Sequence, residues 1–151
     1  VLQTHNIEDI GWNWGEKAIY YNTPDYKWFF LKAAQKIQAV LVLYHPKDSR
    51  IDGKKISYID YLASADWNRV RPGHTPLYKN SARILMREAA KHSTNVLSYR
   101  PGFSLHSLPA AEGFYKKLGM KDLGLDAEKQ NLLYLEAEEN IANNIMAATY
   151  V

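Results

Sequence analysis

The residues from Ile37 to Tyr44 (IQAVLVLY) form a nearly unbroken apolar run that is rich in β-branched side chains. Such a run is typical of a strand that is buried on both faces. The aromatic stretch from Tyr26 to Ala33 (YKWFFLKA) precedes it and the stretch from Ile56 to Ser64 (ISYIDYLAS) follows it, and both predict further strands. The polar segment from His45 to Lys55 predicts a surface hairpin loop, so these strands are expected to be antiparallel.

The second half of the chain alternates helices with strands. The clearest helix is predicted from Tyr78 to His92, where apolar residues recur at helical spacing on one face. Phe103–Ser107 predicts a short strand, and the segment that follows begins a second helix at Ser107-Leu108-Pro109 and ends it at Gly119. Asn131–Glu136 predicts the last strand, and residues 138–151 predict a C-terminal helix.

The order of these elements predicts an α+β fold. A strand, a helix and a strand follow one another from Ile56 through His92 to Phe103, and such a crossover makes its two strands parallel. We therefore expect one domain over residues 1–151, with a mixed, mostly antiparallel central sheet and helices on both faces. Residues 1–25 are expected to form an irregular or helical lead-in.

The composition excludes several kinds of site. The chain has no cysteine, so a disulfide framework, a thiol nucleophile and a Cys-ligated zinc are excluded. Its 5 histidines are scattered without metal-ligand spacing, and we expect no metal. No apolar run approaches the roughly 20 residues needed to cross a bilayer, and residues 1–9 do not have the pattern of a secretion signal. We therefore expect a cytoplasmic protein without a membrane partner.

The segment LYKNSAR, residues 77–83, opens the first predicted helix and predicts an anion site. The first N–H groups of a helix have no intrahelical partner, and its N-terminus is partly positive. Lys79 and Arg83 add formal charge, Asn80 and Ser81 can cap the helix, and Ala82 is small enough to let a phosphate approach the backbone. An ordinary capped helix with solvated basic residues is the alternative.

Residues Ala111 to Met120 (AEGFYKKLGM) match the late-helix motif A-x-x-x-Y-x-x-x-G-[FM] of the GNAT superfamily of acyl-CoA N-acyltransferases. The order of elements from about Trp28 to Ala137 also resembles that family, and the stretches Tyr58–Arg69 and Phe103–Met120 resemble a bacterial subgroup of uncharacterised members. The family's pyrophosphate loop, [RQ]-x-x-G-x-[GA], corresponds to residues 77–82. This chain departs from it at Leu77, and at Asn80, which replaces the first Gly and is the next residue most tolerant of a left-handed turn.

The resemblance implies the transfer of an acetyl group from acetyl-CoA to a primary amine by direct attack. It implies that Tyr115 protonates the departing CoA thiolate as a general acid. It also implies two sets of cofactor-binding residues. On the strand that splays from its neighbour, the backbone of Leu62, Ala63 and Ser64 would bind the acyl-pantetheine arm. At the start of the helix that follows, the pyrophosphate would be bound by Lys79, Asn80, Ser81, Ala82 and Arg83.

Three side chains are candidates for the base that takes a proton from the amine: Asp60, Asp66 and His106. His106 lies on the strand expected beside Ile56–Ser64, so it could meet Asp60 across the sheet. A buried histidine and a buried aspartate that only satisfy each other are the alternative. Trp67 and Asn68 are candidates for lining the acceptor pocket.

Two classes of function stay open. The first is an acetyl-CoA-dependent N-acetyltransferase with an unidentified amine acceptor, with or without a homodimer. The second is a non-catalytic module on the same fold, either an acyl-CoA sensor or a domain that contacts nucleic acid through basic residues. Those residues are Arg69, Arg71, Lys79, Arg83 and Arg87. The net charge of +3 is too small to argue for nucleic acid, which we do not expect as a partner.

Overall fold

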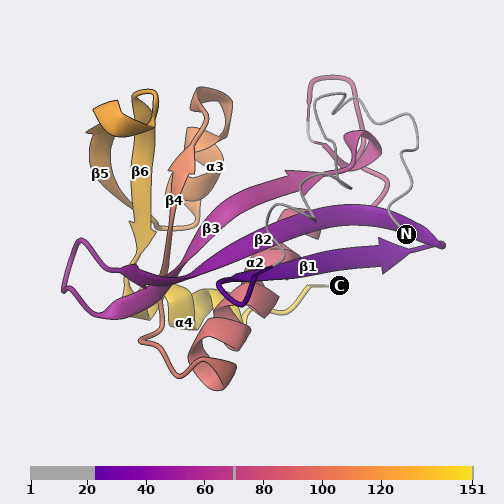
Figure 1. Cartoon of the computed structure of the whole chain (residues 1–151). Helices are drawn as coiled ribbons and strands as arrows, with labels where there is room; N and C mark the ends of the chain where they lie inside the picture. The colour runs from indigo at the N-terminus through magenta and orange to yellow at the C-terminus, as the bar shows by residue number, and fades with distance from the viewer. Residues whose placement is uncertain (1–22, 70, 151) are drawn as a thin grey trace.

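The computed structural model describes residues 23–69 and 71–150 (Figure 1), so most of the predicted lead-in lies outside the described residues. Within them, the strands form one sheet in the order β1-β2-β3-β4-β6-β5. The strands are β1 (Tyr26–Ala33), β2 (Lys36–Asp48), β3 (Lys55–Ser64), β4 (Phe103–Ser107), β5 (Lys121–Asp126) and β6 (Leu132–Ala137). The α-helices are α2 (Ser81–Lys91), α3 (Glu112–Lys117) and α4 (Glu139–Ala147).

The sheet is mixed and mostly antiparallel, which confirms the predicted α+β class. Strand β3 pairs with β4 in parallel, as the crossover through α2 requires, and the other neighbours pair antiparallel. Short single turns complete the chain: η1 (Asp66–Asn68), η2 (His92–Val96, a π-helical extension of α2), η3 (Pro109–Ala111) and η4 (Ala127–Lys129).

Two strand predictions differ from the structure. Strand β2 continues past Tyr44 as far as Asp48, where Lys47 and Asp48 pair with Ile56 and Lys55, so the predicted hairpin loop is shorter. Strand β5 was not predicted at all. Its sequence, KDLGLD, is polar and broken by Gly124, which takes a φ of +95° at an irregularity of the β5–β6 pairing. Pairing with β6, and not its own residue pattern, makes this edge segment a strand.

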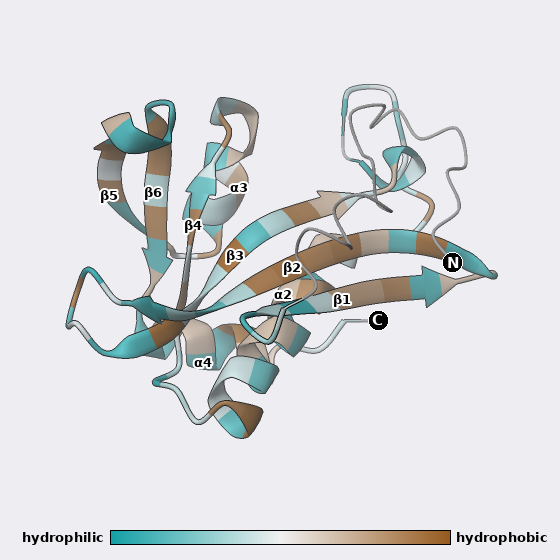
Figure 2. Ribbon diagram, viewed as in Figure 1, coloured by the Kyte–Doolittle hydropathy of each residue, from teal (hydrophilic) through white to brown (hydrophobic). Residues whose placement is uncertain are grey.

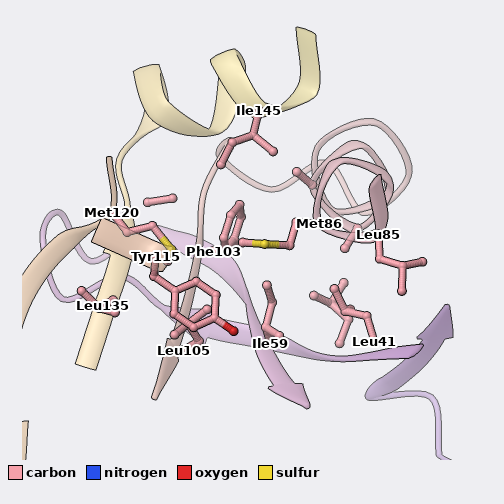
Figure 3. Close-up of a cluster of buried hydrophobic side chains, with 14 of the residues drawn as sticks. Leu41, Ile59, Leu85, Met86, Phe103, Leu105, Tyr115, Met120, Leu135 and Ile145 are labelled. Carbon is pink, nitrogen blue, oxygen red and sulfur yellow. The ribbon is translucent and has the colours of Figure 1, made fainter. Parts of the chain in front are cut away.

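The core lies between one face of the sheet and the helices. Leu41, Ile59, Phe103 and Leu105 on the strands pack against Leu85 and Met86 of α2, Tyr115 of α3 and Ile145 of α4 (Figure 3). Figure 2 shows the apolar residues that run along β1 and β2. The three α-helices of the described residues therefore share one face, and the helices expected on the second face are not among the described elements.

The sheet opens between β3 and β4. Their pairing consists of Ser57 with Phe103 and Tyr58 with Ser104, after which β3 turns away (Figure 1). A bulge in β3 accompanies the turn, because Leu43 pairs with Ile59 while the next residue of β2 in the register, Val42, pairs with Tyr61. The rest of β3, up to Ser64, therefore keeps its pairing with β2, and no strand of residues 23–69 or 71–150 pairs with its other side.

Candidate active site

The opening presents backbone groups of β3 that pair with none of the described strands. The amide of Ala65 donates to the Gln38 carbonyl on β2 at 2.9 Å. Because backbone groups of successive strand residues point to opposite sides, Ala63 also faces β2, whereas Leu62 and Ser64 face the opening. The carbonyl of Ser64 accepts from Arg69 Nε at 3.0 Å. Of the predicted arm-binding residues, Leu62 therefore offers its backbone to the opening most freely.

A hydrogen-bonded brace holds the loop that connects β3 to α2. Gln38, which is 1% exposed, accepts at Oε1 from Trp67 Nε1 at 2.7 Å and from Asn68 Nδ2 at 2.9 Å. Asn68 Oδ1 in turn accepts from the amide of Tyr78 at 2.9 Å. Trp67 and Asn68 thus tie this loop to β2. The sequence suggested that they line an acceptor pocket, and in the structure their polar side-chain atoms support the loop.

The first turn of α2 has the geometry that the loop motif requires. Asn80 takes a left-handed conformation, with φ of 63° and ψ of 21°, which is the backbone state that the Gly of the motif would supply. The first intrahelical bond runs from the Ile84 amide to the Asn80 carbonyl, so the amides of residues 81–83 precede it. Lys79 is exposed, and the guanidinium of Arg83 lies 5.4 Å from the centre of the Phe114 ring. The helix begins at Ser81, later than predicted, because of this left-handed residue.

Tyr115 lies on α3 at the border between the core and the opening. The residue is 9% exposed, and burial raises the pKa of its hydroxyl to about 12. Figure 3 shows its ring above the strands, with the hydroxyl turned toward the space between Leu105 on β4 and Ile59 on β3. On the side of the helices, therefore, the opening is bordered by a phenol that stays protonated at neutral pH.

His106 lies on the other face of the sheet, and its partners are not those that the sequence suggested. Its Nδ1 lies 2.6 Å from the Tyr58 hydroxyl and its Nε2 lies 2.9 Å from Asp126 Oδ2, so both ring nitrogens are engaged. The expected contact with Asp60 is wrong, because the bulge in β3 intervenes and Asp60 is exposed. The Tyr134 ring packs against the imidazole with centroids 4.9 Å apart.

Asp126 is held as an anion. Its Oδ2 accepts from His106 and from Arg50 Nη2 at 3.1 Å, and its Oδ1 accepts from the Glu128 amide at 3.1 Å. The hydrogen bond from His106, then that from Arg50, lowers the pKa of this carboxyl to about 2. Sequence reasoning missed Tyr58 and Asp126, because the only signal was the period-2 alternation that places Tyr58 on the face opposite Ile59.

We expect the contribution of Asp126 to stability to depend on pH. Its pKa is about 2 in the folded chain against a reference of 3.8, so the stabilisation is present above the reference value and is lost as the pH falls through the folded value. Asp126→Asn should therefore unfold at lower urea concentration than wild type at neutral pH, and the two curves should converge between about pH 4 and 2. A difference that persists undiminished at pH 2 contradicts this assignment.

The remaining base candidate, Asp66, is committed to an ion pair. Arg71 Nη1 lies 2.9 Å and Arg71 Nη2 3.3 Å from its two carboxylate oxygens. The Arg71 guanidinium beside Asp66 lowers the pKa of that carboxyl. A carboxylate stabilised in this way is a poor proton acceptor, which leaves His106 as the stronger candidate.

The β2–β3 loop is anchored on β6 by a buried carboxylate. Glu136 is 0% exposed, and it accepts from Ser49 Oγ at 2.5 Å, from the Arg50 amide at 2.9 Å and from Arg100 Nη2 at 3.2 Å. Arg100 Nε also lies 3.0 Å from Asp52 Oδ2 in the loop. This cluster fixes the position of Arg50, and through it that of Asp126.

Within residues 23–69 and 71–150, no group of three His, Asp or Glu side chains could hold a metal ion. No helix of the described chain is long and apolar enough to span a membrane.

No family model matches the sequence, and no curated protein matches it either. Solved structures do match. A bacterial toxin has a TM-score of 0.66 at 16% identity, over 92% of this chain and 81% of that one. The KacTA–DNA complex has a TM-score of 0.57 at 15% identity, over 97% and 95%. The PaiA N-acetyltransferase from Thermoplasma acidophilum, in complex with coenzyme A, has a TM-score of 0.55 at 16% identity, over 81% and 65%.

Identities this low establish the fold alone. Within that fold the sheet opens between β3 and β4, and α2 begins after a left-handed residue, as the resemblance to the GNAT superfamily implied. The chain therefore has the fold of the GNAT acyl-CoA N-acyltransferases.

Proposed function

We propose that this chain is an N-acetyltransferase that moves an acetyl group from acetyl-CoA to a primary amine. The observation that carries the proposal is the convergence of three features on one opening: the backbone of Leu62 and Ser64 that faces it, the first turn of α2, and the Tyr115 hydroxyl. The structural likeness to an N-acetyltransferase that was solved with coenzyme A supports the same conclusion.

The two charged parts of acetyl-CoA would be held separately. The pyrophosphate would lie against the amides of residues 81–83, which the positive end of α2 and the side chains of Lys79 and Arg83 make favourable. The pantetheine arm would enter between β3 and β4 and pair with the backbone of Leu62 and Ser64. The thioester would then lie beside the Tyr115 hydroxyl.

The reaction would proceed by direct attack. The neutral amine nitrogen bonds to the thioester carbon, giving a tetrahedral intermediate, and the C–S bond then breaks to release the CoA thiolate. Because burial keeps the Tyr115 hydroxyl protonated, with a pKa of about 12, it donates to the sulfur while negative charge develops there. The nitrogen carries one extra proton after the attack. As the Tyr115 proton passes to the sulfur, this nitrogen proton passes to the Tyr115 oxygen, so that the products are the neutral amide and the CoA thiol.

The alternative of a nucleic-acid-contacting domain is less well supported, although one structural neighbour is a complex with DNA. Three of the five basic residues on which it depends are engaged within the chain. Arg69 donates to the Ser64 carbonyl, Arg71 pairs with Asp66, and Arg87 donates to Glu88 and to the Ala148 carbonyl. Lys79 and Arg83 remain, and they lie where the pyrophosphate is expected.

The variant Ala82→Val tests the phosphate site. A β-branched side chain in the first turn of α2 should keep an anion from the backbone amides, and each charge-assisted hydrogen bond lost costs about 1.5–3 kcal/mol. We therefore expect acetyl-CoA to bind about 10–100-fold more weakly by calorimetry. With acetyl-CoA at 100 times its Kd, the folding free energy of wild type should gain about 2.7 kcal/mol.

Ala147→Val is the matched control, because Ala147 is an exposed residue in the last turn of a different helix. It should bind acetyl-CoA as wild type does. Equal affinity of Ala82→Val and wild type would show that the pyrophosphate lies elsewhere. If millimolar acetyl-CoA does not stabilise wild type against unfolding, the result would contradict both the transferase and the acyl-CoA sensor.

A further inference from the structure

A chain of three side chains runs across the face of the sheet that is turned away from the helices. Asp126 Oδ2 accepts from His106 Nε2, and His106 Nδ1 lies within 2.6 Å of the Tyr58 hydroxyl. Tyr58 is the last residue of β3 that pairs with β4. The chain of hydrogen bonds therefore leads from a fixed carboxylate to the edge of the opening.

The positions of the protons follow from the two ends of this chain. Asp126 is an ionised carboxylate and accepts only, so His106 Nε2 carries the hydrogen between them. In the neutral imidazole the lone pair is then on Nδ1, and the Tyr58 hydroxyl donates to it. Burial raises the pKa of Tyr58, with Asp60 and Tyr134 adding to the effect, so Tyr58 keeps its proton until another one replaces it.

We propose that Tyr58, His106 and Asp126 form a proton relay that deprotonates the acceptor amine, a role that rests on the proposed acetyl transfer. The ammonium gives a proton to Tyr58 Oη while the proton of Oη passes to His106 Nδ1. The amine becomes neutral, its lone pair is free to form the C–N bond, and His106 becomes an imidazolium paired with Asp126. The imidazolium later releases its extra proton to water.

The two tyrosines divide the reaction between the faces of the sheet. Tyr115 approaches the opening from the helix side, and Tyr58 and His106 lie on the opposite side. The incoming amine and the departing sulfur would therefore be served by different groups, so neither proton transfer competes with the other. His106 is the base, Tyr58 contacts the amine, and Asp126 is a positioning residue.

The surroundings of His106 matter to the relay. Charged and titratable groups face it from every neighbouring element: Tyr58 and Asp60 on β3, Lys47 and Arg50 from β2 and its loop, Tyr134 and Glu136 on β6, and Asp126 with Lys129 at the end of β5 and in η4. A protonated His106 has no lone pair on Nδ1 for the Tyr58 proton. The relay therefore requires a neutral His106 before the amine can give up its proton.

Two variants and two kinds of amine test the relay. Tyr58→Phe and His106→Asn would be assayed for CoA release from acetyl-CoA with benzylamine, which is protonated at neutral pH, and with aniline, which is neutral there. Both variants should bind acetyl-CoA as wild type does, because neither residue lies at the phosphate site. With benzylamine kcat/KM should fall about 10²–10⁴-fold, and with aniline less than about tenfold.

Tyr99→Phe is the matched control, because it removes a tyrosine hydroxyl that lies 3.3 Å from a histidine nitrogen, His45 Nδ1, outside the relay. It should leave both rates unchanged. The tautomer of His106 in wild type, read by ¹⁵N NMR at neutral pH, gives a measurement without any variant, and we expect protonation at Nε2.

Each failure has its own signature. Equal losses with both amines, unchanged rates, or the opposite tautomer overturn the relay and leave the transferase intact. Wild type that binds acetyl-CoA but releases CoA with neither amine overturns both, in favour of a sensor. Wild type that does not bind acetyl-CoA overturns the proposed function itself.

Discussion

Replacing Tyr115 with phenylalanine should lower kcat by about 10²–10⁴-fold, the usual contribution of a general acid. The substitution keeps the ring that packs in the core beside Leu105 and Ile59 and removes only the hydroxyl that faces the opening. That hydroxyl makes no hydrogen bond to another residue in the described part of the chain, so its loss leaves no buried partner unsatisfied. Affinity for acetyl-CoA and the midpoint of urea unfolding should both stay close to wild type.

Steady-state kinetics with acetyl-CoA and an amine panel, beside calorimetric titration, separate the possible outcomes. Parallel losses in affinity and turnover would mean that the hydroxyl positions the cofactor and does not serve the leaving group. Unchanged turnover would make Tyr115 a core residue and reduce the motif match to a likeness of fold. Tyr99→Phe controls for the loss of a tyrosine hydroxyl elsewhere in the fold, and it should change neither quantity.

Arg100→Met should cost about 3–5 kcal/mol of folding free energy, because it leaves the buried carboxylate of Glu136 without its cationic partner. The Arg100 side chain is 7% exposed and that of Glu136 is 0% exposed, so water does not replace the lost guanidinium. Arg100 also donates to Ser49 Oγ and to the Pro101 carbonyl, and both contacts end with the substitution. Equilibrium unfolding in urea at neutral pH measures the loss.

Lys55→Met is the control for this effect. Lys55 pairs with Asp48 at 3.4 Å, but the two side chains are 60% and 75% exposed, and such a pair contributes about 0–1 kcal/mol. If Arg100→Met costs no more than Lys55→Met, then the Glu136 carboxyl is protonated in the folded chain or water reaches it. Loosening of the β2–β3 loop in Arg100→Met should also weaken the Arg50–Asp126 contact, so its kcat/KM with benzylamine should fall.

The elements with the strongest periodic patterns were predictable from the sequence, since burial on one or both faces imposes a spacing that local reading detects. The strands from Tyr26, Ile37 and Ile56 and the α2 helix follow this rule, and the parallel β3–β4 pair follows from the length of the crossover between them. Strand β5 escaped because it is a short, polar edge strand whose regularity comes from β6.

The helix-side half of the candidate site was also predictable, because it is local in sequence. The left-handed state of Asn80 follows from the turn that opens α2, and Tyr115 is carried by a motif within one helix. The partners of His106 were not predictable from the sequence. Tyr58 and Asp126 are 48 and 20 residues away from it, and no spacing rule joins residues that lie on three separate strands of a sheet.

The sequence by itself thus determined the class of fold, the crossover and the turn that opens α2, because each depends on contacts within one element or between neighbours in the chain. Only the tertiary structure decided that His106 meets Tyr58 and Asp126 instead of Asp60. The physical reason is the bulge in β3. One extra residue between Ile59 and Tyr61 changes the face of the sheet to which the later side chains of that strand point, where the sheet opens.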